Sequence, residues 1–167
     1  QIDQAKKIGG KGALLYLDLD DFKHINDGLG HQYGDVLLQQ VAAGLQGIAG
    51  IRGHCYRMGG DEFVVIVKPE QFIGISKIIK NVVALFNRPW YLRGTEYFCT
   101  MSMGVATFPD NSDDVHEIVK MADMAMYDAK RSGKNSSKQP ESQPPTILYC
   151  RLPMKPFFAK YCLACSA

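Results

Sequence analysis

Two short acidic clusters are the strongest candidates for chemistry in this sequence. Asp18 and Asp20 end an apolar run, and Asp61 and Glu62 follow a pair of glycines. If the clusters meet, their carboxylates form a set of hard oxygen donors without a Cys or His partner, which is the set that Mg²⁺ prefers. Magnesium in turn favours phosphate chemistry, because it neutralises charge on phosphoryl oxygens. The acids also have a simpler interpretation as solvated or capping groups, with Asp21 as the N-cap of a helix.

Other residues near these clusters could contact a nucleotide. Asn26 and Asp35 could together read a guanine edge, because a carboxylate accepts from its N–H groups and an amide both donates and accepts. Gly59-Gly60 would let a ligand approach the backbone, since glycine has no Cβ. The ordinary alternatives are turn formation or helix initiation for the polar pair and a tight hairpin for the glycines. An isolated lysine is usually a solvated surface residue. Three lysines are nevertheless candidate phosphate partners: Lys23, Lys130 and Lys134.

A buried strand over residues 13–20 must position the first cluster. Strand alternation would place Asp18 and Asp20 on one face and Leu19 on the other. The pattern predicts further strands at 54–58, 63–67, 90–92 and 97–103, with hairpin turns at Gly59-Gly60 and Arg93-Gly94.

Helical spacing of apolar residues predicts four helices. They cover 22–26, a segment from His31 to the glycines after residue 46, 69–86, and a segment from 115 to a C-cap at Gly133. The last helix would start with a capping box of Asp114 and Glu117. Its apolar face would comprise Val115, Ile118, Val119, Ala122, Ala125 and Met126. Interleaved strands and helices indicate an α/β or α+β fold in which one mixed sheet is flanked by helices.

The composition indicates a globular domain and does not point to either of two classes of partner. With 19 Lys and Arg against 17 Asp and Glu, the net charge of +2 does not suggest a nucleic-acid or membrane surface. The polar start and the lack of a long apolar run predict a cytoplasmic domain, and a sensor or membrane anchor would lie outside this chain. Cys55 and Cys99 fit small core residues. Cys162 and Cys165 have zinc-like spacing but lack a second ligand pair.

We expect one domain over residues 1–135. Residues 136–167 begin as a polar, proline-containing linker and continue without sustained periodicity, so we expect a poorly structured tail.

Four ordered motifs resemble the GGDEF family of diguanylate cyclases. The signature is Gly59-Gly60-Asp61-Glu62-Phe63, and a second motif runs from residue 17 to 35. The third and fourth motifs cover 103–106 and 122–135. The resemblance spans about residues 12 to 135 and is specific, because all four motifs keep their order and separation.

The resemblance implies a fold like that of nucleotidyl cyclases and polymerase palm domains. It implies that GTP is the substrate and that two copies, in a transient homodimer, each hold one GTP. Each 3′-hydroxyl would attack the other α-phosphate, giving cyclic di-GMP and pyrophosphate with two Mg²⁺ ions, or Mn²⁺ in their place, per site. A fused sensor or phosphodiesterase domain is an expected partner, and nucleic acid is not.

The resemblance also assigns roles by position. Asp18, the Leu19 carbonyl, Asp61 and Glu62 would hold the metal ions. Asp61, which would also help to deprotonate the hydroxyl, Glu62 and Lys23 would act in catalysis. The implied substrate contacts are Asn26 and Asp35 for guanine, Lys130, Lys134 and the amides near Asp21 and Phe22 for phosphate, and Gly60 and His31 beside the nucleotide.

Three departures from the family pattern stand out. The arginine and aspartate of its product-inhibition site are replaced in Gly50-Ile51-Arg52-Gly53, which predicts no feedback inhibition there. Residues 1–11 do not supply the family's first helix and Asn-Arg loop, and no closing strand is recognisable after residue 135.

Two alternatives to an active cyclase remain. One is a silent GTP-sensing domain that regulates a neighbouring phosphodiesterase module. The other is a cyclase that tolerates adenine, which Asp35 disfavours because a carboxylate repels the N1 lone pair of adenine.

Overall fold

The structure is a computed structural model that describes residues 1–132, and its centre is a four-stranded sheet. The strand order is β2-β3-β1-β6, and every neighbouring pair is antiparallel. The strands are β1 (Gly12–Leu19), β2 (Cys55–Gly59), β3 (Glu62–Val67) and β6 (Met101–Phe108). A separate hairpin joins β4 (Trp90–Leu92) to β5 (Thr95–Tyr97). The predicted class, a central sheet flanked by helices, is confirmed.

The sheet is not mixed, however, within the described part of the chain. β1 and β2 run in the same direction, but the β2–β3 hairpin inserts β3 between them. Each strand therefore has only antiparallel neighbours. Periodicity predicts strands but not which of them become adjacent, so this detail could not be read from the pattern.

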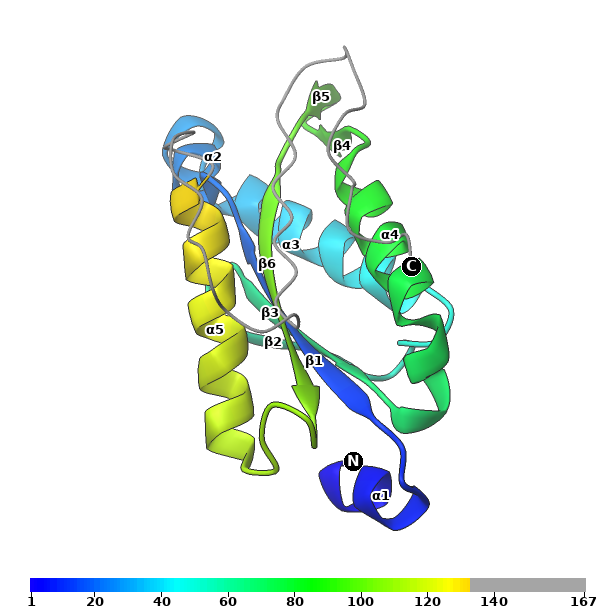
Figure 1. The fold of residues 1–167 in the computed structure, drawn as a ribbon. Helices are drawn as coiled ribbons and strands as arrows, with labels where there is room; N and C mark the ends of the chain where they lie inside the picture. Colours follow the sequence, from blue (N-terminus) through cyan, green and yellow to red (C-terminus); the bar gives the residue numbers. More distant parts are fainter. Residues whose placement is uncertain (133–167) are drawn as a thin grey trace.

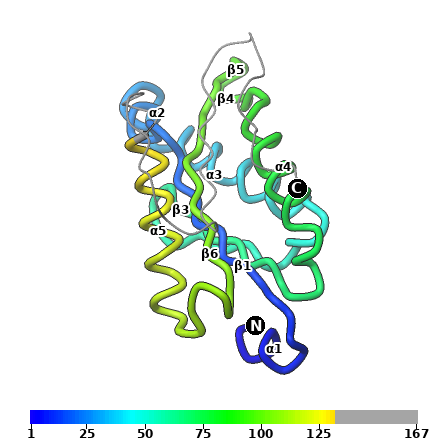
Figure 2. Tube along the Cα trace, viewed as in Figure 1, coloured from blue at the N-terminus to red at the C-terminus, as the bar shows by residue number. Residues whose placement is uncertain are grey.

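Helices cover both faces of the sheet, as Figure 1 shows, with α5 on one face and α3 and α4 on the other. α2 lies at the end of the sheet opposite α1, and the trace in Figure 2 shows the same arrangement. The helical elements are α1 (Ile2–Ile8), α2 (Phe22–Leu29), α3 (His31–Gln46), the 3-10 helix η1 (Pro69–Gly74), α4 (Ile75–Phe86) and α5 (Val115–Ser132).

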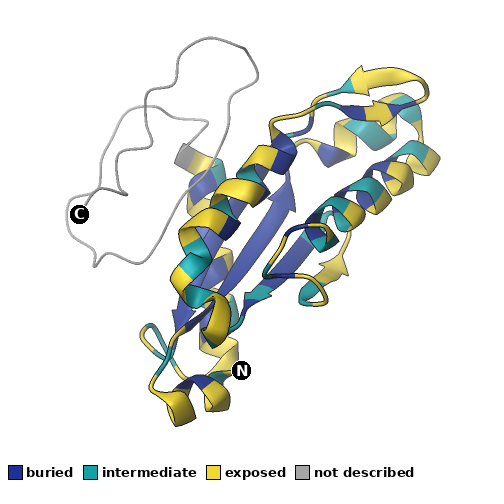
Figure 3. Cartoon of the chain, turned by 90° about the vertical axis from the view of Figure 1, so that its right-hand side faces the viewer, coloured by how far each residue is buried: buried dark blue, intermediate teal, exposed yellow. Residues whose placement is uncertain are grey.

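The two faces of β1 belong to different clusters of buried side chains. Leu15, Leu17 and Leu19 lie in the larger core with α3 and α4. Leu14 and Tyr16 lie in a smaller cluster with Ile118, Ala122 and Met126 of α5. All eight residues of β1 are buried, and Figure 3 shows the central strands enclosed between helices whose outer faces are exposed. A strand covered on both faces is a rigid support for groups at its end.

The helix α1 corrects the expectation that residues 1–11 supply no helix. Ile2–Ile8 is helical and ends at Gly9, whose φ of 61° is the left-handed conformation of a C-cap. Ala5 is fully buried in the smaller cluster, and Lys6 forms a 2.5 Å ion pair with Asp113. So short a segment holds too few apolar residues for a periodic signal, and packing decides its structure.

The predicted strand 97–103 is also wrong, because two strands share it. β5 ends at Tyr97 and β6 begins at Met101. Between them the chain crosses from the small hairpin to the main sheet, where the Thr100 carbonyl accepts the N–H of Asp20 at 2.9 Å. The Arg93-Gly94 turn is confirmed, with positive φ at both residues.

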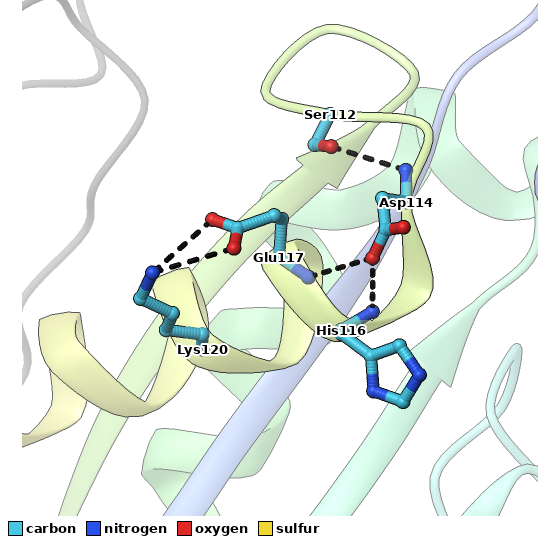
Figure 4. Close-up of polar contacts among 5 residues, drawn as sticks. All are labelled: Ser112, Asp114, His116, Glu117 and Lys120. Atoms are coloured by element: carbon cyan, nitrogen blue, oxygen red, sulfur yellow. Dashed lines mark hydrogen bonds and ion pairs between the residues drawn. The ribbon is translucent and has the colours of Figure 1, made fainter.

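The start of α5 is capped as predicted on one side only. Asp114 Oδ1 accepts the N–H groups of His116 and Glu117 at 2.7 and 3.1 Å (Figure 4). The side chain of Glu117 does not return a bond to Asp114, because it pairs with Lys120, and the Asp114 N–H donates to Ser112 instead. The residues of the predicted apolar face are buried or half-buried, except Val115 in the first turn, which is 61% exposed.

No helix in residues 1–132 is long and apolar enough to cross a membrane. Several predictions concern residues outside the described part: the C-cap at Gly133, the phosphate contact of Lys134, the tail over 136–167 and the Cys162–Cys165 pair.

Candidate active site

The carboxylate of Asp18 lies at the end of the central strand, between two neighbours. In the strand register Asp18 is opposite Glu62 of β3 on one side and Ser102 of β6 on the other. Asp18 is only 7% exposed. Directly opposite residues in an antiparallel sheet project to the same face, so Asp18 and Glu62 share the face that α5 covers. The structure therefore brings the two acidic clusters together, which is the condition that the expected metal site required.

The glycine pair forms the β2–β3 turn, one residue later than expected. Gly59 pairs with Glu62, so Gly60 and Asp61 occupy the turn itself. Gly60 has a φ of 50°, and no atom lies within 4 Å of the place where a Cβ would be. The left-handed backbone at position 60 therefore favours glycine. Because no other group lies close to this position, the turn is open to solvent.

Two hydrogen bonds hold the turn against the strand end. The Asp61 carbonyl accepts the N–H of Leu19 at 3.3 Å, and Arg57 Nε donates to the Gly60 carbonyl at 2.9 Å. The first bond joins the backbone of Asp61 to the strand that carries Asp18. Sequence reasoning missed the part played by Arg57, since its only signal was its position just before the glycine pair.

Lys130 of α5 supplies a positive charge to this acidic end. Its Nζ lies 2.5 Å from Asp18 Oδ1, and the side chains are 33% and 10% exposed. Burial raises the pKa of Asp18 most, Lys130 opposes that rise, and the charges of Asp61 and Glu62 add to it. The carboxylates are thus close enough to act on one another electrostatically. The predicted phosphate partner Lys130 belongs to this site.

Tyr16 extends the polar end of the same sheet face. Burial raises the pKa of its hydroxyl most, and the charges of Glu62 and Asp123 raise it further. The hydroxyl therefore remains protonated at neutral pH beside the acids.

Asp20 serves a structural function in the described molecule. Its carboxylate accepts hydrogen bonds from Thr100 Oγ1 at 2.7 Å and Ser102 Oγ at 2.8 Å. These bonds fasten the chain after β1 to β6, and hydrogen bonds to a charged acceptor are among the stronger ones. Sequence reasoning missed these bonds, because they join residues about 80 positions apart in the chain.

The chain leaves β1 in a left-handed turn at Asp21. Asp21 precedes α2 with a φ of 57°, and its side chain makes no capping hydrogen bond. Asp21 therefore occupies the N-cap position of α2, as the simpler interpretation expected, but its side chain does not cap the helix, because the left-handed backbone differs from the extended conformation of a capping residue. Phe22 is buried and anchors the helix, and Lys23 is exposed in its first turn. Backbone N–H groups at such a helix start can bind an anion.

Asn26 lies where α2 meets α3. A Cβ on Gly34 would be 1.9 Å from Asn26 Oδ1, so the glycine is needed for the amide to pack against α3. Asn26 Oδ1 is buried without a hydrogen-bond partner among residues 1–132. A buried acceptor left unpaired costs about 1–3 kcal/mol, so a ligand donor there would be favoured. His31, at the exposed start of α3, lies nearby in sequence.

Asp35 lines a groove of about 350 Å³ between α3 and the β2–β3 hairpin. Leu38 and Phe63 form an apolar part of its wall, and Arg57 lies at the same groove. An exposed acid beside an apolar wall suits a flat ring that also carries N–H donors. The groove lies on the sheet face opposite α5.

The donor chemistry fits the divalent metal ions that the resemblance implies. Asp18, Asp61 and Glu62 offer carboxylate oxygens, and Leu19 offers a carbonyl. No three Asp, Glu, His or Cys side chains of residues 1–132 converge into a complete metal cage. Magnesium is usually held by one or two carboxylates together with substrate phosphates and water, so this partial set suits a metal ion that arrives with a nucleotide.

The two charged positions expected of a product-inhibition site are glycines in left-handed backbone conformations. Gly50 has a φ of 93° and Gly53 a φ of 77°. Gln46 fastens this loop, since its Oε1 accepts the N–H of Gly53 at 2.8 Å. The neighbouring Arg52 Nε donates to the Gln46 carbonyl at 3.4 Å.

Comparisons with known proteins agree on one family. The sequence profile described as "Diguanylate cyclase, GGDEF domain" matches residues 1–136. The chain is 34% identical over 134 residues to the bifunctional diguanylate cyclase/cyclic di-GMP phosphodiesterase MucR of Pseudomonas aeruginosa, covering 80% of this chain and 20% of that protein. It is 36% identical over 138 residues to the diguanylate cyclase TpbB of the same species, covering 81% of this chain and 32% of that protein. The chain therefore spans a third or less of these relatives.

A solved structure shares the fold. The crystal structure of the GGDEF domain of TpbB superposes with a TM-score of 0.71 at 33% identity, covering 78% of this chain and 83% of that one. The sequence and the fold of this chain thus point to the same group of proteins.

Proposed function

The chain belongs to the GGDEF-domain family of diguanylate cyclases, which act in cyclic di-GMP signalling, and we propose that it is itself an active cyclase that condenses two GTP molecules. The proposed catalytic domain is residues 1–135. In the reaction, each 3′-hydroxyl oxygen bonds to the α-phosphorus of the other GTP, the bond from that phosphorus to the β-phosphate breaks, and pyrophosphate leaves. Two such steps close the ring of cyclic di-GMP.

The observation that carries the proposal is the meeting of two acidic clusters at one end of the sheet. Asp18 is opposite Glu62 in the strand register, and the turn with Asp61 is bonded to Leu19. Asp18 is also a buried acid, and its burial raises its pKa. Such costly arrangements are typical of functional sites.

Residues from both clusters would hold the metal ions. We assign the carboxylates of Asp18, Asp61 and Glu62 and the carbonyl of Leu19 to Mg²⁺ or Mn²⁺, two per site. Bound there, the ions would neutralise charge on the phosphate oxygens and lower the pKa of the attacking hydroxyl. Asp61, in the open turn, is the residue that we assign to receive the hydroxyl proton.

The phosphates would lie along the start of α2. The N–H groups that follow Asp21 and Phe22, the ammonium groups of Lys23 and Lys130, and the open turn at Gly60 are the contacts that we assign to them. An anion bound there would also stabilise the left-handed turn at Asp21. Lys134 is assigned to the same phosphates by resemblance alone, because it lies outside the described residues.

The guanine base would contact Asn26 and Asp35. The buried, unpaired oxygen of Asn26 supports this assignment, because guanine carries N–H donors that would satisfy it. Asp35 would accept from the same edge, and Leu38 and Phe63 would pack near the ring. His31 is assigned beside the nucleotide at the start of α3.

A product assay tests the proposal. The purified chain is incubated with GTP and Mg²⁺ over a range of protein concentrations, and cyclic di-GMP and pyrophosphate are quantified by chromatography. We expect both products in a ratio of one to two. Asp61→Asn should lower turnover by at least about 10³-fold, which is the scale of losing a group that acts in the transition state.

Asp3→Asn is the matched control, because it changes an exposed acid of α1 at the opposite end of the sheet (Figure 1). It should leave turnover unchanged, and both variants should unfold at the wild-type temperature. Full turnover by Asp61→Asn would contradict the metal and base assignments.

The second candidate is the silent GTP-sensing domain. The relative MucR, whose name combines a cyclase with a phosphodiesterase, makes a neighbouring phosphodiesterase module a reasonable partner for this chain. GTP binding without product, at protein concentrations that permit two copies to associate, would establish this alternative instead.

A further inference from the structure

We propose that Lys130 is a positioning residue that neutralises Asp18 until a nucleotide arrives, and that it thereby makes metal binding depend on nucleotide binding. The proposal rests on the assignment of Asp18 as a metal ligand. It goes beyond that assignment, because it concerns how two ligands of one site control each other.

The ammonium group of Lys130 contacts a carboxylate oxygen of Asp18 that we assign to the metal ion. Lys130 Nζ lies 2.5 Å from Asp18 Oδ1, and Asp18 has little other access to solvent, with 10% of its side chain exposed. A divalent cation that binds the same oxygen would be brought within a few ångströms of the ammonium charge. Because like charges repel strongly at that distance in a partly buried site, the two cations compete for Asp18.

Lys130 can leave Asp18 without leaving the site. It lies in the last turn of α5, and its side chain is one-third exposed. A lysine has a flexible four-carbon stem and a point charge, so it can turn from a carboxylate to a phosphate oxygen at small cost. The triphosphate proposed beside the start of α2 would offer such oxygens.

The exchange links the two ligands thermodynamically. Phosphates that attract Lys130 free the Asp18 carboxylate for a metal ion, and a metal ion on Asp18 frees Lys130 for the phosphates. Each ligand therefore raises the affinity of the other by the same factor. The site would stay closed to free cations and would accept a metal ion together with a nucleotide.

The test measures Mn²⁺ binding without nucleotide, by the loss of the free-ion electron paramagnetic resonance signal. Lys130→Met keeps the length of the side chain and removes its charge. It should bind Mn²⁺ about tenfold more tightly than the wild type, a factor within the usual range of such couplings. Lys130→Arg keeps the charge and should bind as weakly as the wild type.

Lys120→Met is the matched control, since Lys120 is on the same helix ten residues earlier and pairs with Glu117. It changes the net charge equally and should leave Mn²⁺ affinity unchanged. Asp18→Asn in the Lys130→Met background should abolish the gain. A second measurement is thermal unfolding, in which Mn²⁺ should raise the midpoint of Lys130→Met more than that of the wild type.

Equal Mn²⁺ affinity of wild type and Lys130→Met, or an equal gain in Lys120→Met, would overturn the proposal. So would a lack of detectable binding to both proteins when each binds Mn²⁺ with a non-hydrolysable GTP analogue. These results do not depend on turnover. A chain without cyclase activity whose Lys130→Met variant gains Mn²⁺ affinity would refute the proposed activity and keep this inference.

Discussion

The two faces of β1 differ in the function that their side chains serve. On the face of α3 and α4, Leu15, Leu17 and Leu19 continue one large apolar core to the end of the strand. On the face of α5, the apolar cluster is smaller and gives way to Tyr16 and then Asp18. One strand thus supports the fold with one set of alternate residues and carries the proposed metal ligand Asp18 with the other. The comparison shows that the proposed metal ligand is carried by a strand whose other face is buried in the larger core.

A substitution at the contact between α5 and the sheet should have the largest effect on the face of β1 that carries Asp18. A Cβ on Gly104 would lie 2.0 Å from the Ala122 carbonyl oxygen and 2.4 Å from the Met126 amide nitrogen. Backbone atoms cannot rotate away, so Gly104→Ala must push α5 off the sheet. We expect a loss of about 3 kcal/mol in the free energy of unfolding, measured with urea, and loss of the Lys130 contact with Asp18.

Gly28→Ala is the matched glycine control, because a Cβ at Gly28 meets nothing within 4 Å. In the helix α2 it should be neutral or stabilising by up to about 1 kcal/mol. An unchanged free energy of unfolding in Gly104→Ala would show that α5 does not pack closely on this face.

Removing the charge of Asp18 tests the same comparison of the two faces of β1, with a smaller expected change in the free energy of unfolding. Burial, with the nearby charges of Asp61 and Glu62, raises the pKa of Asp18 in the folded state. The folded protein therefore holds this proton more tightly than the unfolded chain, and stability falls as pH rises from the unfolded to the folded pKa. At neutral pH without metal ions, Asp18→Asn should raise the free energy of unfolding by about 1 kcal/mol.

The gain should disappear below the ordinary aspartate value of 3.8, where both proteins carry a neutral side chain. Urea titrations at several pH values in the presence of a chelator measure it. A less stable Asp18→Asn at neutral pH would mean that the Lys130 ion pair outweighs the cost of burying the acid.

Much of this fold could be predicted from apolar spacing and turn residues. The run before Asp18 gave β1, and positive φ at Gly60, Arg93 and Gly94 occurs where glycine turns were expected. The meeting of Asp18 with the Gly-Gly turn was expected only if the hairpin lay beside the central strand, and the strand order supplies that adjacency. The resemblance supplied the expectation that the nucleotide is GTP, which spacing alone does not carry.

Long-range contacts could not be predicted in the same way. The pairing of Lys130 with Asp18 and of Thr100 with Asp20 joins residues far apart in sequence, and no local pattern encodes it. The capping box at Asp114 is only half formed, because the Glu117 side chain pairs with Lys120 and not with the Asp114 N–H. The ion pair and the capping bond are both weak, so local sequence does not predict which one forms.

The most direct test of the central claim is a crystal structure of the chain with Mn²⁺ and a non-hydrolysable GTP analogue, with anomalous scattering to locate the metal. The account predicts an anomalous peak at about 2.0–2.2 Å from an Asp18 carboxylate oxygen. The same manganese ion should also contact a carboxylate oxygen of Asp61 or Glu62 and a phosphate oxygen. A nucleotide-bound structure whose manganese peaks lie away from Asp18 would contradict it.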